Sequence, residues 1–211
     1  LATRLADPAP WCAIVVLHIN VKACVPERTG DGEFVTVYSG RKEYTPIARA
    51  HAIRYRFRVA AVGANHVRIV LAAPFGPLAT RDYELTFEAV PIGGRTFVSV
   101  HYPFRTSVAS RVATGAYLAT AGSGKAGFTV VGRDDRGRPA WIGGVRGIVE
   151  RNAMRNVLAL DAWLATCDAP VGERFARSVA RMAALTGRYP VQLVEMPADE
   201  YATIKHREWQ E

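Results

Sequence analysis

Two asparagines one helical turn apart are the first residues of this chain whose position suggests chemistry. Asn152 and Asn156 lie in residues 144–167, GVRGIVERNAMRNVLALDAWLATC, whose period predicts one long amphipathic helix. On a helical wheel both amides point close to the middle of the apolar stripe. A buried amide without a partner costs about 1 to 3 kcal/mol, so each must meet the other amide, the sheet, water or a ligand. The pair is a first indication of a binding site.

His101 is the histidine best placed for chemistry, because Ser99 lies on the same face of its predicted strand. If that face points inward, His101 could act as a general base or hydrogen-bond a ligand. A hydrogen-bonded histidine in the core or at its rim is the alternative. Val98, Val100 and Tyr102 form the other face, and the alternation alone does not decide which face is buried.

Aromatic side chains alternate with polar ones in two predicted strands. In residues 53–59, Tyr55 and Phe57 share one face while three arginines occupy the other. In residues 83–89, Tyr83 and Phe87 alternate with Glu and Thr side chains. This period of two predicts half-buried strands whose aromatic faces point inward. These rings either pack as core or line a cavity, where they bury ligand surface and their hydroxyls orient the ligand.

Other candidates for chemistry are isolated in the sequence. The five histidines stand alone, and no His, Cys, Asp or Glu group has the spacing of a metal site. Residues 122–125, GSGK, invite comparison with a phosphate-binding loop. The leading glycine of that motif would fall at Ala119, however, and Ala126 stands where Ser or Thr is required. We therefore predict a flexible turn there, and no catalytic residue, metal or cofactor.

Three arginines form a stripe on a helix predicted over residues 173–186. Arg174, Arg177 and Arg181 lie opposite the apolar side of that helix, which carries Phe175 and Val179. The stripe either contacts an anionic membrane surface, which would help a carrier exchange its lipid, or is simply a solvated face.

The elements that must position these residues follow from the hydrophobic pattern. Six stretches separated by turn signals predict an antiparallel meander of about six strands, at residues 15–24, 34–39, 53–59, 67–71, 83–89 and 96–104. A helix over 106–120 and a hairpin of 127–132 with 139–142 come before the long helix. Helices over 173–186 and 199–209 follow it, with a short linker between Pro190 and Pro197.

The bulk composition bounds the class of protein. The chain has 211 residues, of which 49% are hydrophobic and 22% charged, the balance of a soluble globular protein. No apolar run approaches the roughly 20 residues of a membrane span. The net charge of +8 comes mostly from arginine, a skew that GC-rich coding can produce. We therefore expect a soluble cytoplasmic or periplasmic protein with no nucleic-acid partner.

The first residues and the cysteines leave alternatives open. The segment LATRLADPAPW has the character of a helix end interrupted by Pro8, so we expect a further segment upstream of Leu1. An extended strand would hold Cys12 and Cys24 about 40 Å apart, so a disulfide between them needs a turn near Cys12. The three cysteines are therefore either buried or free thiols, or include a Cys12–Cys24 bridge.

Four stretches resemble bacterial proteins of the START-like superfamily, whose relatives include polyketide cyclases and plant pollen allergens. They are RDYELTFEAVP, GGRTFVSVHYPF, KAGFTVVG and GGVRGIVERNAMRNVLALDAWL, within residues 81–164. The resemblance implies an α+β helix-grip fold, in which an antiparallel meander wraps around a long C-terminal helix and encloses an apolar cavity. Two departures stand out. The usual first strand and two small helices are largely missing, and the helix and hairpin of residues 106–142 are inserted before the long helix.

The resemblance implies a START-like domain over residues 1–170 and a C-terminal helical extension over 171–211. The expected function is binding or transport of a lipid-like or polyketide-like molecule, with Tyr55, Phe57, Tyr83, Phe87, His101, Asn152 and Asn156 around it. A cyclase- or hydrolase-type enzyme using the same cavity is one alternative. A protein-interaction module with a filled core is the other.

Overall fold

The computed structural model describes residues 2–63, 66–76, 81–103, 105, 108–120, 122 and 124–210. Its elements, in chain order, are α1 (Ala2–Leu5), α2 (Pro8–Val15), β1 (Val21–Thr29), β2 (Gly32–Ser39), the 3₁₀ turn η1 (Ile47–Arg49), β3 (His51–Val62), β4 (Val67–Phe75), β5 (Arg81–Ile92), β6 (Arg95–His101), α3 (Val108–Ala119), β7 (Val130–Arg133), β8 (Pro139–Trp141), α4 (Gly144–Leu164), α5 (Val171–Thr186), α6 (Pro190–Leu193) and α7 (Ala198–Trp209).

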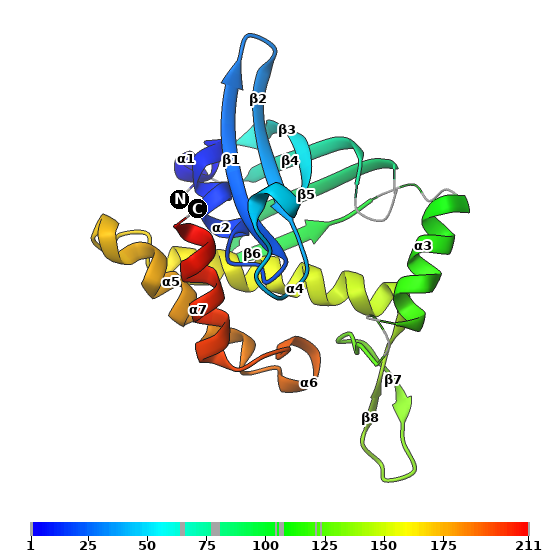
Figure 1. Ribbon diagram of the computed structural model, residues 1–211. Coiled ribbons are helices and arrows are strands. Elements are labelled where there is room, and N and C mark those ends of the chain that lie inside the picture. The colour runs from blue at the N-terminus through cyan, green and yellow to red at the C-terminus, as the bar shows by residue number, and fades with distance from the viewer. Residues whose placement is uncertain are drawn as a thin grey trace.

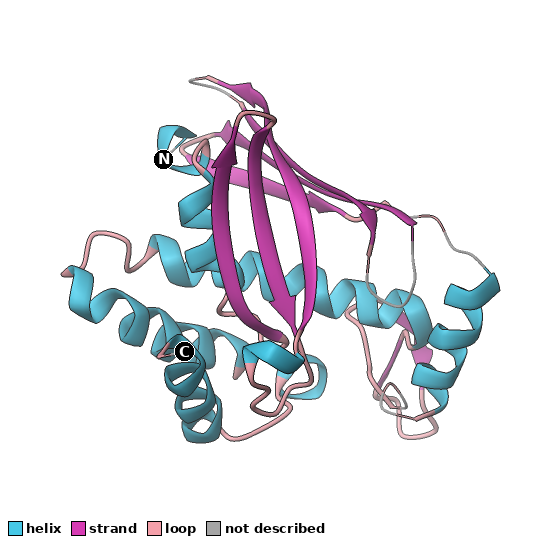
Figure 2. Ribbon diagram, turned by 45° about the horizontal axis from the view of Figure 1, so that its top comes forward, coloured by secondary structure: helices cyan, strands magenta, loops and turns pink. Residues whose placement is uncertain are grey.

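The main sheet confirms the predicted antiparallel meander and the α+β class. Its six strands follow one another in the order β1 to β6, each antiparallel to the next. The register aligns apolar residues across neighbouring strands: Phe57 faces Leu71, and Leu71 also faces Leu85. Because alternate residues share a face, one side of the sheet is apolar and packs inward. The sheet is strongly curved, and α4 crosses beneath it (Figure 2).

The prediction for residues 15–24 is wrong in its first half. The chain is helical over α2, and β1 begins only at Val21. Two local signals start this helix: the carboxylate of Asp7 accepts a hydrogen bond from the backbone N–H of Ala9 at 2.8 Å, and Pro8 occupies the first helical position. Of the β-branched residues that suggested a strand, Val15 ends the helix, while Val16 and Ile19 are buried in the turn that follows it. β1 also continues through Pro26, which an edge strand tolerates.

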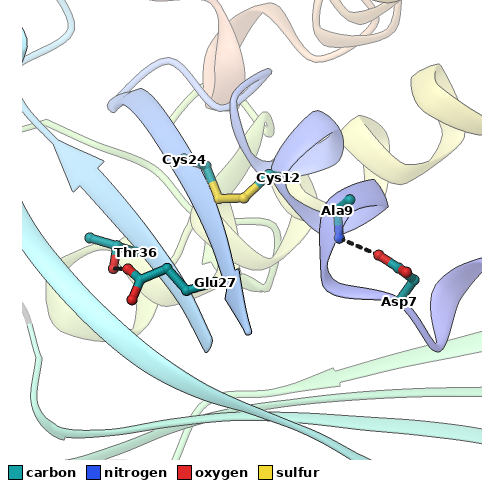
Figure 3. Close-up of a disulfide and its surroundings, with 6 residues drawn as sticks. All are labelled: Asp7, Ala9, Cys12, Cys24, Glu27 and Thr36. Carbon is teal, nitrogen blue, oxygen red and sulfur yellow. Dashed lines mark hydrogen bonds between the residues drawn. A yellow bond between two sulfur atoms is a disulfide. The ribbon is translucent and has the colours of Figure 1, made fainter. Parts of the chain in front are cut away.

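A disulfide fastens α2 to the sheet. Figure 3 shows Cys12 on α2 bonded to Cys24 on β1, with the two Cα atoms 5.0 Å apart. The bridge is possible because the chain turns back between the helix and the strand, as the distance argument required. Cys167 is a free thiol.

The long helix α4 is packed on two sides, which the predicted single stripe did not anticipate. It ends at Leu164, and Cys167 lies in the turn beyond. Val145 is 44% exposed although it is apolar, whereas Arg151 and Arg155 are buried. The reason is a second layer: the sheet and α2 lie on one side of α4, and α5 to α7 lie on the other (Figures 1 and 2).

The helix and hairpin before α4 and the C-terminal helices agree with their predictions in type. α3 and the β7–β8 hairpin lie at the N-terminal end of α4 (Figure 1), and α5 and α7 pack together beside its C-terminal half. The expected linker at residues 190–197 contains the short helix α6. Among the residues that the structure describes, no helix combines the length and the apolarity needed to cross a membrane.

Candidate functional site

Three tyrosines gather beneath the inner face of the sheet. Tyr55 comes from β3, Tyr83 from β5, and Tyr102 follows the end of β6. Their rings form a chain, with centroids 6.0 Å apart between Tyr55 and Tyr83 and 6.4 Å apart between Tyr83 and Tyr102. Tyr55 and Tyr83 were predicted to face inward, and Tyr102 completes the cluster from the strand face whose burial the sequence left open.

The cluster reaches α4 through Asn156. The side-chain amide of Asn156 donates a hydrogen bond to the hydroxyl of Tyr102, so this half-buried amide has a protein partner. No described residue hydrogen-bonds the hydroxyl of Tyr55, although the residue is only 8% exposed. The hydroxyl of Tyr55 is therefore available for a hydrogen bond to a ligand.

Burial keeps the tyrosine hydroxyls protonated. It raises the pKa of Tyr83 to about 12 and raises those of Tyr55 and Tyr102 above their ordinary value of 10.0. Hydroxyls with such pKa values are neutral near pH 7. They can donate and accept hydrogen bonds, but they are poor general bases.

Phe57 and Phe87 belong to a packed core next to the tyrosines. Their rings contact Trp11 of α2, with centroids 6.5 Å and 5.1 Å from that of the indole, and each is 3% exposed. A space of about 30 Å³ remains between Trp11, Phe87 and α4, room for about one water molecule. The sequence did not predict this arrangement, because residues 1–11 were interpreted as an interrupted helix end and the strand was expected to begin at residue 15.

His101 lies on the other face of the sheet. Val98 and Val100 are the inward residues of β6, paired across the strands with Ala89 and Phe87. The ring of His101 is exposed, and its Nε2 is 2.8 Å from the hydroxyl of Ser99. The structure therefore places His101 away from the tyrosines and from both asparagines.

Asn152 meets a histidine that the sequence did not single out. His18, in the turn between α2 and β1, is 7% exposed and hydrogen-bonds the side chain of Asn152. Its Nδ1 accepts a hydrogen bond from the backbone N–H of Asn20 at 3.1 Å. Burial, assisted by the positive charges of Arg155 and Lys205, lowers the pKa of His18 to about 3, so the ring is neutral at pH 7.

The other side of α4 carries a buried ion cluster that the helical wheel did not reveal. Arg151 and Arg155 each direct an Nη2 to Oε1 of Glu195, at 2.6 Å and 2.8 Å, and Lys125 approaches the second carboxylate oxygen at 3.2 Å. Burial opposes the ionisation of Glu195, but these cations outweigh it and lower the pKa of Glu195 to about 2. We call Lys125, Arg151, Arg155 and Glu195 the Glu195 cluster.

A second ion cluster fastens α7 to β1. The Nζ atoms of Lys22 and Lys205 lie 2.7 Å and 2.6 Å from the carboxylate oxygens of Glu208, and all three side chains are at most 2% exposed. The hydroxyl of Tyr201 donates to the carbonyl of Leu17 at 2.7 Å beside them. These contacts hold the C-terminal helices against the rest of the protein.

A cavity of about 260 Å³ lies in this C-terminal half, and the sequence gave no sign of it. Its walls come from α4, α5, the segment 193–198, α7 and the turn before β1. They are mostly apolar, with Leu17, Ile19, Met182, Leu193, Met196 and Tyr201 among them. Arg155 and Glu195 provide the charged part of the lining.

The arginine stripe of α5 is engaged with neighbouring groups. Arg177 pairs with Glu173 at 2.6 Å, and Arg181 pairs with Asp161 at 3.0 Å. The Nε of Arg174 donates to the carbonyl of Ala169 at 2.7 Å. Contact with an anionic membrane surface would therefore compete with existing interactions of all three side chains.

Neither a metal site nor a match to a known protein assigns a role to the described residues, so the site is interpreted from its geometry. Within the described part of the chain, no three His, Cys, Asp or Glu side chains are grouped as a metal site. No family model, curated protein or solved structure matches this sequence. The resemblance to the START-like superfamily accordingly stays a prediction.

Proposed function

We propose that this protein binds an amphipathic hydrophobic molecule between the sheet and α4, at the tyrosine cluster. The observation that carries the proposal is the gathering of Tyr55, Tyr83, Tyr102 and Asn156 in apolar surroundings. Ring faces contribute affinity by burying apolar surface, at about 25 cal/mol per Å². Hydroxyl and amide groups fix the orientation of the bound molecule.

Tyr55 supplies the main polar contact in this proposal. The hydroxyl of Tyr55 has no hydrogen-bond partner among the described residues and is not fully enclosed, so a bound molecule or water can reach it. A hydroxyl, carbonyl or amine on the ligand would satisfy it. Phe57 and Phe87 form the wall that Trp11 supports, and neither Asn152 nor His101 contributes, because Asn152 is bonded to His18 and His101 lies outside.

The proposal includes membership of the START-like superfamily and its helix-grip arrangement around α4. The six-stranded meander and the long helix that follows it support this assignment. A cyclase or hydrolase has less support, because it needs an acid–base pair near the ligand. Among the described residues beside the cluster, the tyrosines have raised pKa values and the nearby Asn156 does not titrate.

A titration with a neutral fluorescent probe, N-phenylnaphthylamine, tests the proposal. The wild-type protein should bind it and enhance its emission. Loss of one hydrogen bond in Tyr55→Phe should weaken binding by up to about tenfold, and Asn156→Leu should weaken it as well. Circular dichroism should show both variants folded.

Tyr38→Phe is the matched control, since Tyr38 lies on the outer face of the same sheet, opposite Ala52 of β3. Its affinity for the probe should equal that of the wild type. Equal affinities in all the variants, or no binding by the wild type, would contradict the proposal.

A further inference from the structure

The cavity among the C-terminal helices is distinct from the tyrosine site. α4 separates the two: Asn156 contacts Tyr102 on the sheet side, whereas its neighbour Arg155 lines the cavity on the side of α5 and α7. The volume of about 260 Å³ is close to the lower end for small-molecule sites. Its occupant is therefore a small molecule or a short chain.

Most of the cavity wall is apolar and adaptable. Met182 of α5 and Met196 of the segment before α7 face it, together with Leu17 and Leu193. Methionine side chains are flexible and polarisable, so they adjust to chains of different shape. Such walls favour a hydrocarbon chain over a polar ligand.

Arg155 and Glu195 line the polar end of the cavity, and further cations lie behind this lining. Arg151, Arg155 and Lys125 all contact the carboxylate of Glu195, so three cations face one anion. Lys42 adds a further cation, since its Nζ donates to the backbone carbonyl of Glu195 at 3.3 Å. The arginine side chains are at most 5% exposed, and in such a medium charges act strongly on a ligand.

We propose that this cavity binds a medium-chain carboxylate, with its anionic group toward Arg155 and its chain between Met182, Met196 and Tyr201. The guanidinium group is suited to a carboxylate because it offers planar, paired donors. An ammonium head group would meet the same cations, and the one lining anion, Glu195, is already paired with three of them. This inference does not rest on the function proposed for the tyrosine site.

Isothermal titration with decanoate, decanol and decylamine, each below its aggregation concentration, tests the head-group preference. Decanoate should bind more tightly than decanol, and decylamine should not bind. In a series of shorter carboxylates, each methylene added should strengthen binding about fourfold until the cavity is full. Equal binding of decanoate and decylamine would overturn the inference, as would failure of decanoate to bind.

Two alanines of α5 give a matched pair of variants. Ala183 lines the cavity, while Ala184 is exposed on the same helix. Ala183→Leu should fill part of the cavity and weaken decanoate binding about tenfold, whereas Ala184→Leu should not change it. If thermal unfolding shows that Ala183→Leu is not folded, Ala198→Leu obstructs the same cavity from α7.

The variants also separate this site from the tyrosine site. Tyr55→Phe should leave decanoate binding unchanged. If Tyr55→Phe weakens decanoate binding and the cavity variants do not, decanoate binds under the sheet and the inference fails, while the proposed function stands. If the wild type binds decanoate in the cavity but does not bind the probe at the tyrosine site, this inference stands and the proposed function fails.

Discussion

The two sides of α4 are packed by different kinds of side chain. Toward the sheet, the helix meets aromatic rings and neutral hydroxyls, and Asn156 bonds the hydroxyl of Tyr102. Toward α5 and α7, it meets buried ions, and Arg151 and Arg155 bond Glu195. Arg155 and Asn156 are consecutive in the chain. What decides their environments is the layer that each faces.

Substitutions on the two sides of α4 should therefore destabilise the protein to different degrees. Burial of rings contributes in proportion to area and degrades gradually when one contact is lost. A buried ion cluster depends on every member, because removing the anion leaves cations without compensation in a medium of low dielectric constant. The side of the C-terminal helices should therefore be the more sensitive to single substitutions.

The largest expected effect comes from removing the charge of Glu195. Glu195→Gln leaves Arg151, Arg155 and Lys125 facing a neutral amide, and the free energy of unfolding should fall by about 3 to 5 kcal/mol. Urea unfolding measures it. Glu173→Gln is the control, since the exposed pair with Arg177 should be worth less than about 1 kcal/mol. Similar losses in both variants would show that burial does not make the Glu195 cluster more sensitive than an exposed ion pair.

Acid should act on the same side through His18. The pKa of His18 is lowered from 6.5 to about 3, so below pH 6.5 the unfolded chain binds a proton that the folded protein does not. Stability is thus lost as pH falls from 6.5 toward 3, by about 2 kcal/mol between pH 6.5 and 5. Urea unfolding at these two pH values measures the change.

A His18→Gln variant, tested at the same two pH values, isolates this contribution. The loss between pH 6.5 and 5 should be smaller by about 2 kcal/mol than in the wild type. Glu195 loses its contribution mainly between about pH 4.5 and about pH 2, below the interval from pH 6.5 to 5 in which the variant and the wild type are compared. An unchanged pH dependence in the variant would show that His18 is not the group responsible.

The smallest expected changes in stability come from removing the hydroxyl of Tyr201 or of Tyr55. Tyr201→Phe leaves the carbonyl of Leu17 without its hydrogen bond and should cost about 1 to 2 kcal/mol. Tyr55→Phe removes a hydroxyl that no described residue bonds, so thermal and urea unfolding should show almost no loss. A clear destabilisation by Tyr55→Phe would mean that its hydroxyl serves folding, and would weaken its assignment to a ligand.

The sheet was predictable because its strands have one solvated face. Alternation of arginines with Tyr55 and Phe57, and of acidic residues with Tyr83 and Phe87, gave both the strands and their inward side. Residues 1–11 were interpreted as a helix end interrupted by Pro8, whereas Asp7 and Pro8 carry the signals of a new helix start. The strand expected from residue 15 does not form there: α2 ends at Val15 and Val16 caps it, and the tertiary burial of Val16 is not visible in the local pattern.

The Glu195 cluster could not be predicted from the periodicity of the sequence. On a wheel, Arg151 and Arg155 fall on a polar face, and nothing local indicates that Glu195, 44 and 40 residues away, will cover them. The requirement that buried amides find partners was sound for Asn152 and Asn156. The identity of those partners, His18 and Tyr102, depended on a turn and a strand end that pattern analysis could not place.

Native mass spectrometry of the freshly purified chain, followed by organic extraction, tests the central claim most directly. The account predicts one apolar or amphipathic molecule per chain, retained by Tyr38→Phe and lost when Tyr55→Phe and Asn156→Leu are combined. A mass that corresponds to protein alone, with no uptake from a panel of lipids and other hydrophobic molecules, would contradict it and favour an interaction module.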